Sequence, residues 1–141
     1  FVLGETGWPR GGNLRPHRSH ANGLSADVFV PVRDAEDRPG RFGCWPWNKF
    51  GYGLQFDASG RSDGWRIDFE ALAALLGEID RQAPRHGVRV ERIIVAPEYV
   101  DRLLRTPSGR RLGGLGSRFV RWRPWWRHDE HVHVDFRGTD R

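Results

Sequence analysis

Five of the six histidines in this 141-residue chain fall into two clusters that are far apart in the sequence. Each cluster lies beside a segment in which apolar and polar residues alternate as in a β-strand, and each also contains carboxylates. When two distant strands meet, such clusters can hold one metal ion between them. The candidate residues are His17, His20 and Asp27 near the start, and His128, His131 and His133 near the end.

The spacing within each cluster indicates which side chains can converge. His20 and Asp27 are seven positions apart, at the two ends of a short passage of loop and strand. The Asn22-Gly23 pair between them consists of residues that form turns. His131 and His133 are two positions apart, so on a strand both imidazoles point to one face and can enter one cavity.

Zinc suits such a donor set, because it takes imidazole nitrogen and carboxylate oxygen, and a catalytic site supplies three protein ligands and leaves one position for water. Bound water then loses a proton near neutral pH, which provides hydroxide for attack on a carbonyl group. Either spacing on its own is common in structural or solvated histidines. The two together, with the remaining His86 in an ordinary helix-exit segment, favour a metal site.

The strands that would position these residues can be located by their alternation. Residues 24–32 are predicted as a buried strand that Pro31 weakens or ends. Further strands are expected at the start of the chain, over residues 88–95 and over the segment that begins near residue 131. These strands, together with the helices between them, predict an α+β fold with a mainly antiparallel sheet and flanking helices.

Two helices are expected between the strands. Apolar spacing over residues 67–82 predicts a helix, which Asp63 or Asp68 is expected to cap and Pro84 to end. A second, short helix is expected from residue 97 to about residue 105, because a proline at position 97 suits the first turn of a helix.

Length and composition agree with a compact enzyme domain. A chain of 141 residues, 38% of them hydrophobic, is expected to form one domain over residues 1–141. The single cysteine, Cys44, excludes an internal disulfide. No apolar run approaches the roughly 20 residues of a membrane span. The chain begins at a hydrophobic Phe1 without a charged and then apolar leader, so we expect it to be excised from a longer precursor.

Two motifs together, Ser19-x-His20-x-x-Gly23-x-x-x-Asp27 and His131-x-His133, resemble the zinc peptidases that include lysostaphin-type enzymes, D-Ala-D-Ala metallopeptidases and the hedgehog fold. Within that group the chain resembles the penicillin-insensitive murein endopeptidases in particular. This similarity extends to the Trp-Pro-Arg-Gly-Gly segment at residues 8–12, to His17 three residues before His20, and to the spacing His128-x-x-His131-x-His133.

The resemblance implies a fold of the hedgehog and D-Ala-D-Ala-peptidase type, with His20, Asp27 and His133 as zinc ligands. It implies that His131 is the general base or transition-state stabiliser and that His128 is a second catalytic imidazole. It also implies that the substrate is bacterial murein, cleaved in its peptide cross-links, typically at the D-alanyl bond to meso-diaminopimelate. Such an enzyme would act in the periplasm or after secretion.

Three further residues are expected to contact this substrate. By the resemblance, His17 lines the cleft, where it can touch substrate or a second metal; the middle of the chain offers no Asp/His pair to complete such a second site. Arg127, which is next to His128, and Arg10 are expected to pair with the free carboxylates of murein stems, because guanidinium groups bind carboxylates bidentately.

Glu130 leaves a second mechanism open. It stands three residues before His133, where the D-Ala-D-Ala carboxypeptidase and dipeptidase branch has a similar catalytic glutamate. On a strand Glu130 would face away from His131 and His133, so we expect it at the surface. Only a bulge or loop would restore its reach to the site.

The charge of the chain supports a rival function. It carries 23 basic and 18 acidic residues, a formal charge of +5, and arginines between residues 110 and 127 interleave with Phe119 and several tryptophans. Such segments can bind nucleic acid, so a metal-dependent nuclease is a second hypothesis. Murein is also polyanionic, so the same charge suits it, and nucleic acid is not the expected partner. A solvated arginine-rich face, or a zinc-bearing binding module without catalysis, are further alternatives.

Overall fold

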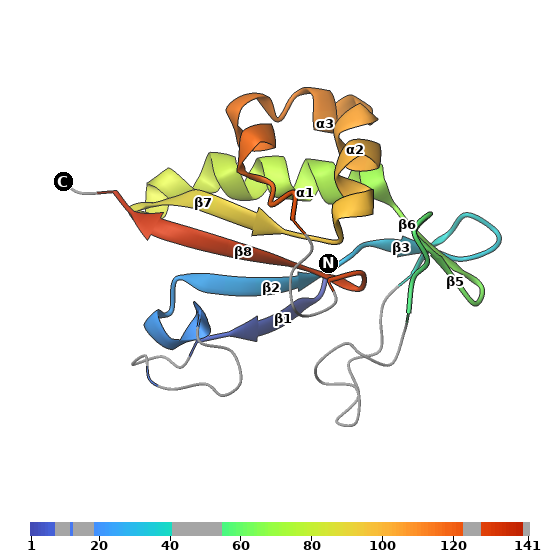
Figure 1. Ribbon diagram of the computed structural model, residues 1–141, viewed down its shortest axis with the longest axis horizontal. Coiled ribbons are helices and arrows are strands. Elements are labelled where there is room, and N and C mark those ends of the chain that lie inside the picture. Colours follow the sequence, from blue (N-terminus) through green and yellow to red (C-terminus); the bar gives the residue numbers. More distant parts are fainter. Residues whose placement is uncertain (8–11, 13–18, 41–54, 123–127, 140–141) are drawn as a thin grey trace.

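The computed structural model describes residues 1–7, 12, 19–40, 55–122 and 128–139, which carry all the elements named here. Their centre is a four-stranded sheet with the strand order β1-β2-β8-β7, in which every neighbouring pair is antiparallel (Figure 1). The long strand β8 lies between strands from the two halves of the chain. The strands are β1 (Leu3–Thr6), β2 (Ser25–Phe29), β7 (Val88–Ile94) and β8 (His131–Gly138).

One face of this sheet is covered by helices (Figure 1). Val132 and Val134 of β8 belong to one buried cluster with Leu72 and Val100 of the helices, and such burial stabilises the fold by about 1.5–3 kcal/mol for each side chain. Because side chains alternate along a strand, the residues between these valines point to the opposite face. The helices are α1 (Phe69–Gln82), α2 (Pro97–Arg105) and α3 (Pro107–Arg110).

Helix α1 ends where its sequence predicts but begins two residues later than expected. Ile67 belongs to strand β6 (Trp65–Ile67), and Asp68 is the residue that caps the helix. The Asp68 carboxylate accepts a hydrogen bond from the backbone N–H of Ala71 at 3.0 Å. After Gln82 the chain continues in a 3-10 turn that contains Pro84, which confirms the expected helix end.

A second, smaller antiparallel sheet has the order β4-β3-β6-β5. Pro31 separates β2 from β3, so the structure divides the expected strand over residues 24–32 between the two sheets. This division confirms that Pro31 ends the first strand. The other strands of the small sheet, each of two residues, are β3 (Val32–Arg33), β4 (Pro39–Gly40) and β5 (Arg61–Ser62).

The molecule is therefore an α+β protein with two antiparallel sheets and several helices, in agreement with the predicted class. The second sheet, helix α3 and the 3-10 helices η1 (Ser19–Asn22) and η4 (Gly113–Arg118) were not predicted. None of the helices in the described part of the chain is both long and apolar enough to cross a membrane.

Candidate metal centre

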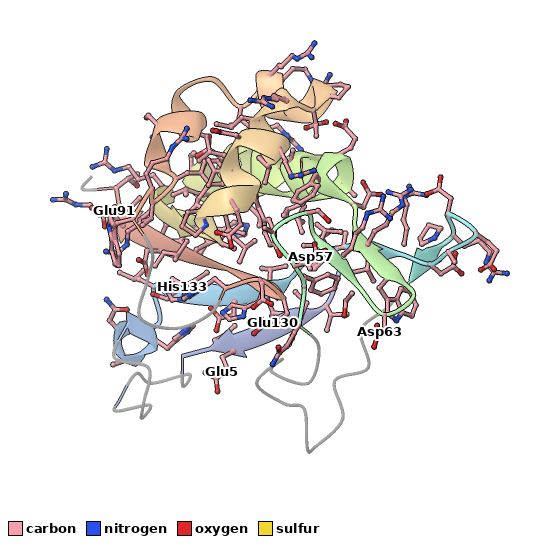
Figure 2. The ribbon with its side chains drawn as sticks, turned by 45° about the vertical axis from the view of Figure 1, so that its right-hand side comes forward. Glu5, Asp57, Asp63, Glu91, Glu130 and His133 are labelled. Carbon is pink, nitrogen blue, oxygen red and sulfur yellow. The ribbon has the colours of Figure 1, made fainter. Side chains whose placement is uncertain are left out.

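The pairing of β2 with β8 brings the two predicted clusters together. Residues directly opposite each other in an antiparallel pair share a face of the sheet. Since Val132 and Val134 face the helices, the polar residues of β8 lie on the other face, where Figure 2 shows His133. The opposite pairs on this face are Asp27 with His133, Ser25 with Asp135, and Phe29 with His131.

His20 reaches the same face from the 3-10 helix η1, and two glycines allow it to do so. A Cβ atom on Gly7 would lie only 2.4 Å from the backbone oxygen of His20, so any side chain there would displace η1. Gly23 has a φ of 73°, which L side chains rarely adopt, and its N–H donates to the backbone oxygen of His20 at 3.2 Å. This confirms the turn predicted at Asn22-Gly23, and it leaves the His20 side chain fully buried.

Asp27 lies between the two histidines. Its Oδ1 is 2.8 Å from Nδ1 of His133, and its Oδ2 is 3.4 Å from Nε2 of His20. One ligand atom from each of the three residues lies within 4.8 Å of the others, and all three side chains are buried. Two imidazole nitrogens and one carboxylate oxygen around a single point are donors that zinc accepts, so this group can bind a metal.

The second nitrogen of His133 is held by a residue that the sequence analysis did not single out. Nε2 of His133 donates to Oδ1 of Asp135 at 2.8 Å. Ser25 Oγ donates to the same oxygen at 2.6 Å, and Arg92 Nε donates to Oδ2 at 2.7 Å. With its proton on Nε2, the imidazole presents the Nδ1 lone pair to the space shared with Asp27 and His20, which is the tautomer a metal ligand requires.

The electrostatics of this group favour a positive charge at His133. Burial alone would lower the pKa of His133, but hydrogen bonds with Asp135 and Asp27 and their charges outweigh it and raise the pKa to about 9. Burial would likewise raise the pKa of Asp27, yet its hydrogen bonds with His133 and His20 hold that pKa far below the usual range. In the metal-free protein His133 is therefore an imidazolium between two carboxylates, and it would have to release its Nδ1 proton to bind a metal ion.

The remaining histidines of the second cluster lie beside this group. The ring centroids of His128 and His131 are 4.8 Å apart, and those of His128 and His133 are 6.4 Å apart. His131 is buried at the start of β8, whereas His128 is half-buried in the segment that enters the strand. The backbone oxygen of His128 accepts from the N–H of Ala96 at 2.7 Å, which fixes that segment against the start of α2.

Glu130 does not lie at the surface, so that expectation is wrong. It is only 1% exposed, because it occupies the bend before β8 rather than a strand position. The bend lets Oε1 approach to 3.1 Å from Nδ1 of His131. Burial raises the pKa of Glu130 and outweighs the hydrogen bond with His131, which lowers it; a smaller rise comes from the hydrogen bond with Asp129. Figure 2 shows Glu130 near His133, on the side of the molecule away from the helices.

Three predicted substrate contacts, His17, Arg10 and Arg127, lie outside the described residues, as does most of the segment 8–12. Their roles stay predictions. Within the described part of the arginine-rich segment, Phe119 is buried in the core and Arg121 pairs with Asp101 at 2.8 Å. Trp122 is the exposed aromatic of this part of the segment.

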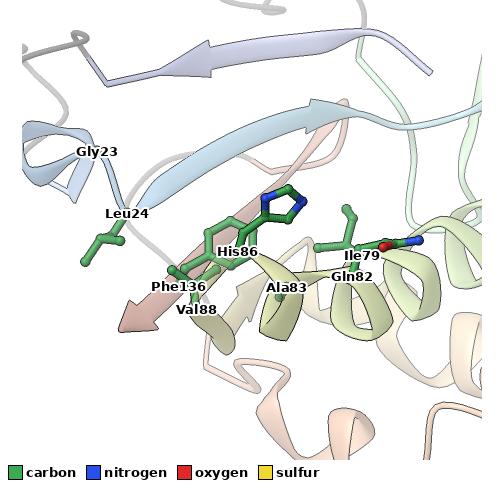
Figure 3. Close-up of a pocket in the computed structure, with 8 residues that line it drawn as sticks. All are labelled: Gly23, Leu24, Ile79, Gln82, Ala83, His86, Val88 and Phe136. Atoms are coloured by element: carbon green, nitrogen blue, oxygen red, sulfur yellow. The ribbon is translucent and has the colours of Figure 1, made fainter. Parts of the chain in front are cut away.

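A separate apolar cavity of about 300 Å³ opens between the end of α1 and the ends of β2 and β8 (Figure 3). Its one titratable residue is His86, the histidine outside the two clusters, which is exposed. The cavity contains none of the predicted ligands or catalytic residues. It is lined by Gly23, Leu24, Ile79, Gln82, Ala83, His86, Val88 and Phe136.

Comparison with protein families identifies the chain. The model of the penicillin-insensitive murein endopeptidase family matches residues 1–140, almost the whole chain. The chain belongs to this family. Membership of the murein endopeptidase family indicates a peptidase that acts on peptidoglycan, and it confirms the resemblance inferred from the histidine motifs. A comparison with curated proteins gave no match.

For this murein endopeptidase, three residues near the site were missed by sequence reasoning: Gly7, Asp129 and Asp135. Asp135 had a usable signal, because it continues the alternation of His131 and His133 and so shares their face of β8. Gly7 and Asp129 had no such signal. The close approach of Gly7 to the His20 backbone and the burial of Asp129 against Phe56 both depend on contacts between segments that are distant in the sequence.

Proposed function

We propose that the chain is a zinc-dependent endopeptidase that hydrolyses the peptide cross-links of murein, at bonds such as that between D-alanine and meso-diaminopimelate. The observation that carries the proposal is the buried group of His20, Asp27 and His133, whose ligand atoms lie within 4.8 Å of one another, in a member of a murein endopeptidase family. The family membership gives no support to a D-Ala-D-Ala carboxypeptidase or to a nuclease. By the same reasoning we assign the molecule the fold shared by these zinc peptidases.

The residues of the group fit zinc by their chemistry. Two imidazoles and one carboxylate match the donor number of catalytic zinc sites, which keep a position for water. The hydrogen bond from His133 to Asp135 is of the kind that orients metal-ligating histidines. When bound at such a site, zinc acts as a Lewis acid and lowers the pKa of water.

His131 and His128 supply the proton transfers and hydrogen bonds of this mechanism. Nδ1 of His131 faces Glu130, which leaves Nε2 to accept a proton at the site. His128, whose ring centroid is 4.8 Å from that of His131, can in its protonated form donate a hydrogen bond to the oxygen of the peptide carbonyl as negative charge develops there. The presence of two imidazoles, those of His128 and His131, beside the proposed ligands supports catalysis rather than binding alone.

Arginines on the face of the sheet that carries His133 support an anionic substrate. Arg92 of β7 pairs with Asp135, and Arg137 follows Asp135 by two positions on β8, so it shares that face. Arg89 lies directly opposite Arg137, and both are exposed. Two like charges directly opposite each other on neighbouring strands repel. Glu91, which is 3.6 Å from Arg137, offsets part of this repulsion, and an anionic substrate could offset more of it. Free carboxylates of murein stems are suitable partners for this face, together with the proposed contacts His17, Arg10 and Arg127.

Murein lies outside the cytoplasmic membrane, so an enzyme that acts on it must be exported. We therefore propose a periplasmic or secreted location. The same activity would serve remodelling of the producer's own wall or attack on another cell's wall.

Digestion of defined muropeptides tests the proposal. The purified protein, loaded with zinc, is incubated with cross-linked dimers and separately with monomeric stems that end in D-Ala-D-Ala, each with and without a chelator. We expect loss of dimers to monomers, prevented by the chelator and restored by added zinc, with the monomeric stems intact. Release of terminal D-alanine from the monomers would instead establish a carboxypeptidase. Intact dimers together with digested DNA or RNA would contradict the proposal in favour of the nuclease.

A further inference from the structure

Two adjacent acidic residues, Asp129 and Glu130, are buried next to His131. They are 6% and 1% exposed, although acidic side chains are seldom buried unless they are paired. Neither belongs to the proposed ligand group of His20, Asp27 and His133. Their burial therefore needs an explanation other than metal binding.

The contacts of the pair hold it firmly in the fold. The backbone oxygen of Glu130 accepts from the N–H of Val30 at 3.0 Å, which anchors it to the end of β2. Oδ2 of Asp129 accepts from the backbone N–H of Phe56 at 2.9 Å, which anchors it to the segment before β5. The carboxyl groups of Asp129 and Glu130 are hydrogen-bonded to each other. These three contacts fix the backbone of Glu130 and the carboxyl groups of both residues, so the Glu130 carboxyl can in turn hold a neighbour.

That neighbour is His131, whose Nδ1 is 3.1 Å from Oε1 of Glu130. An imidazole that acts as a base needs one nitrogen protonated and held, so that the other presents its lone pair to the substrate. A carboxyl oxygen at Nδ1 meets this requirement, because it accepts the N–H there. The ring nitrogen that remains, Nε2, can then exchange a proton.

We propose that Glu130 is a positioning residue that fixes His131 while it is itself a neutral carboxylic acid, with Asp129 as its charged partner. The inference rests on the proposed function, in which His131 accepts a proton. The protons balance as follows: Nδ1–H of His131 donates to Oε1 of Glu130, the Glu130 O–H donates to Asp129, and Asp129 accepts a second hydrogen bond from Phe56. The pair thus carries one negative charge, on Asp129, two residues before His131.

The neutral form of Glu130 follows from its surroundings. Two hydrogen-bonded carboxyl groups in a buried place cannot both ionise without a large cost. Burial raises the pKa of Glu130 by more than the hydrogen bond with His131 lowers it, and the hydrogen bond with Asp129 adds to the rise, while the Phe56 N–H favours the charge on Asp129. His131 and Asp129 are the titratable groups that act most strongly on Glu130.

Glutamine at position 130 separates this role from that of a general base. In Glu130→Gln the amide carbonyl can accept from His131 and the NH₂ can donate to Asp129, so the variant reproduces the neutral acid but cannot take up a proton. We expect it to retain zinc and a kcat close to that of the wild type on cross-linked dimers. Glu130→Ala removes both contacts, and we expect it to lose roughly 10–100-fold in kcat, the usual range for such supporting residues, with KM and zinc content little changed. Glu36→Gln, in an exposed hairpin loop, is the matched control.

Nitrogen-15 NMR of the imidazoles gives a readout that does not depend on turnover. In the zinc-loaded wild type and in Glu130→Gln, His131 should carry its proton on Nδ1 and leave Nε2 unprotonated. A loss of kcat in Glu130→Gln as large as that in His131→Ala would overturn the proposal, and so would a proton on Nε2 of His131 in the wild type. If Glu130→Ala does not fold, the kcat and the His131 tautomer of the wild type and of Glu130→Gln still test the proposal. Failure of the wild type to cleave dimers would refute the proposed function but leave the tautomer measurement as a separate test.

Discussion

Asp27 and His133 lie directly opposite each other on β2 and β8, with Oδ1 of the carboxylate 2.8 Å from Nδ1 of the imidazole. Their contact depends on the register between two strands that are 106 residues apart in sequence. A slip of one residue would turn the side chains of β8 to the other face, which would bury His133 among the helices and expose Val132 and Val134. The apolar contacts on one face of the sheet therefore hold the candidate metal centre on the other.

Asp135 should contribute to metal affinity without touching the metal. Replacement by alanine removes the acceptor that holds Nε2 of His133, so we expect Asp135→Ala to bind zinc roughly 10–100-fold more weakly. Competition with a chromophoric chelator measures the affinity. Asp101→Ala, at an exposed ion pair on α2, is the control and should leave the affinity unchanged. Equal zinc affinity in Asp135→Ala and the wild type would show that Asp135 has no part in holding His133.

Gly7 should be intolerant of any side chain. A Cβ there would lie 2.4 Å from the His20 backbone oxygen, so Gly7→Ala must displace the turn that carries His20. We expect a loss of about 1–3 kcal/mol in the free energy of unfolding, the usual cost of such overpacking, and weaker zinc binding. Gly114→Ala is the control, because a Cβ at Gly114 meets nothing within 4 Å. Denaturant unfolding of both variants checks this, and similar stabilities would contradict the close approach.

His131→Ala should separate catalysis from metal binding. Because the role proposed for His131 is at the reacting groups rather than at the ion, we expect the variant to keep its zinc and to lose roughly 10²–10⁴-fold in turnover. Zinc content and kcat on cross-linked dimers are measured on the same preparation. Loss of zinc from His131→Ala would make it a ligand, and retention of full turnover would remove it from the mechanism.

The metal-free protein should become less stable as the pH rises above neutral. Burial lowers the pKa of His133, but Asp135 and Asp27 outweigh it and raise the value from 6.5 to about 9. A raised folded-state pKa means that protonated His133 stabilises the fold fully below about pH 6.5, and that this contribution is lost as the pH rises through about 9. Zinc binding has the opposite dependence, because it requires His133 without its Nδ1 proton.

Thermal unfolding between pH 6 and 9.5, with and without chelator, measures this difference. The Tm of the chelated protein should fall across the range, while the gap between zinc-loaded and chelated protein should widen. The Tm of chelated His133→Gln should not fall in this way as the pH rises, whereas the Tm of the chelated control His86→Ala should fall as in the wild type. An identical pH dependence of Tm in chelated wild type and His133→Gln would refute the charged His133.

Those parts of the fold that local sequence determines were predictable. The apolar spacing of α1, the break at Pro31 and the shared face of His131 and His133 all follow from periodicities and from proline geometry within a few residues. The short strands of the second sheet were not predictable, because two or three residues show no alternation. Helix α3 has only four residues, too few to produce a periodic pattern.

The three candidate ligands could be predicted from the sequence, but most of the contacts that orient them could not. Spacing indicated that the two histidine clusters could converge, the family resemblance implied His20, Asp27 and His133 as the ligands, and the structure brings these three together. Alternation could have placed Asp135 on the face of His133, but its contacts with Ser25 and Arg92 were not predictable, since they depend on which residues β2, β7 and β8 place side by side. The position of Glu130 shows this most clearly: strand alternation predicts exposure, yet the bend before β8 turns it inward against His131.

Metal analysis of histidine variants tests the central claim most directly. The wild type, His20→Ala, His133→Ala and the control His86→Ala are each loaded with zinc, freed of excess metal and analysed for zinc per chain by mass spectrometry. We expect one zinc per chain in the wild type and in His86→Ala, whose histidine lies at a separate cavity, and little zinc in the other two. Undiminished zinc in both His20→Ala and His133→Ala would contradict the claim that these residues hold the metal.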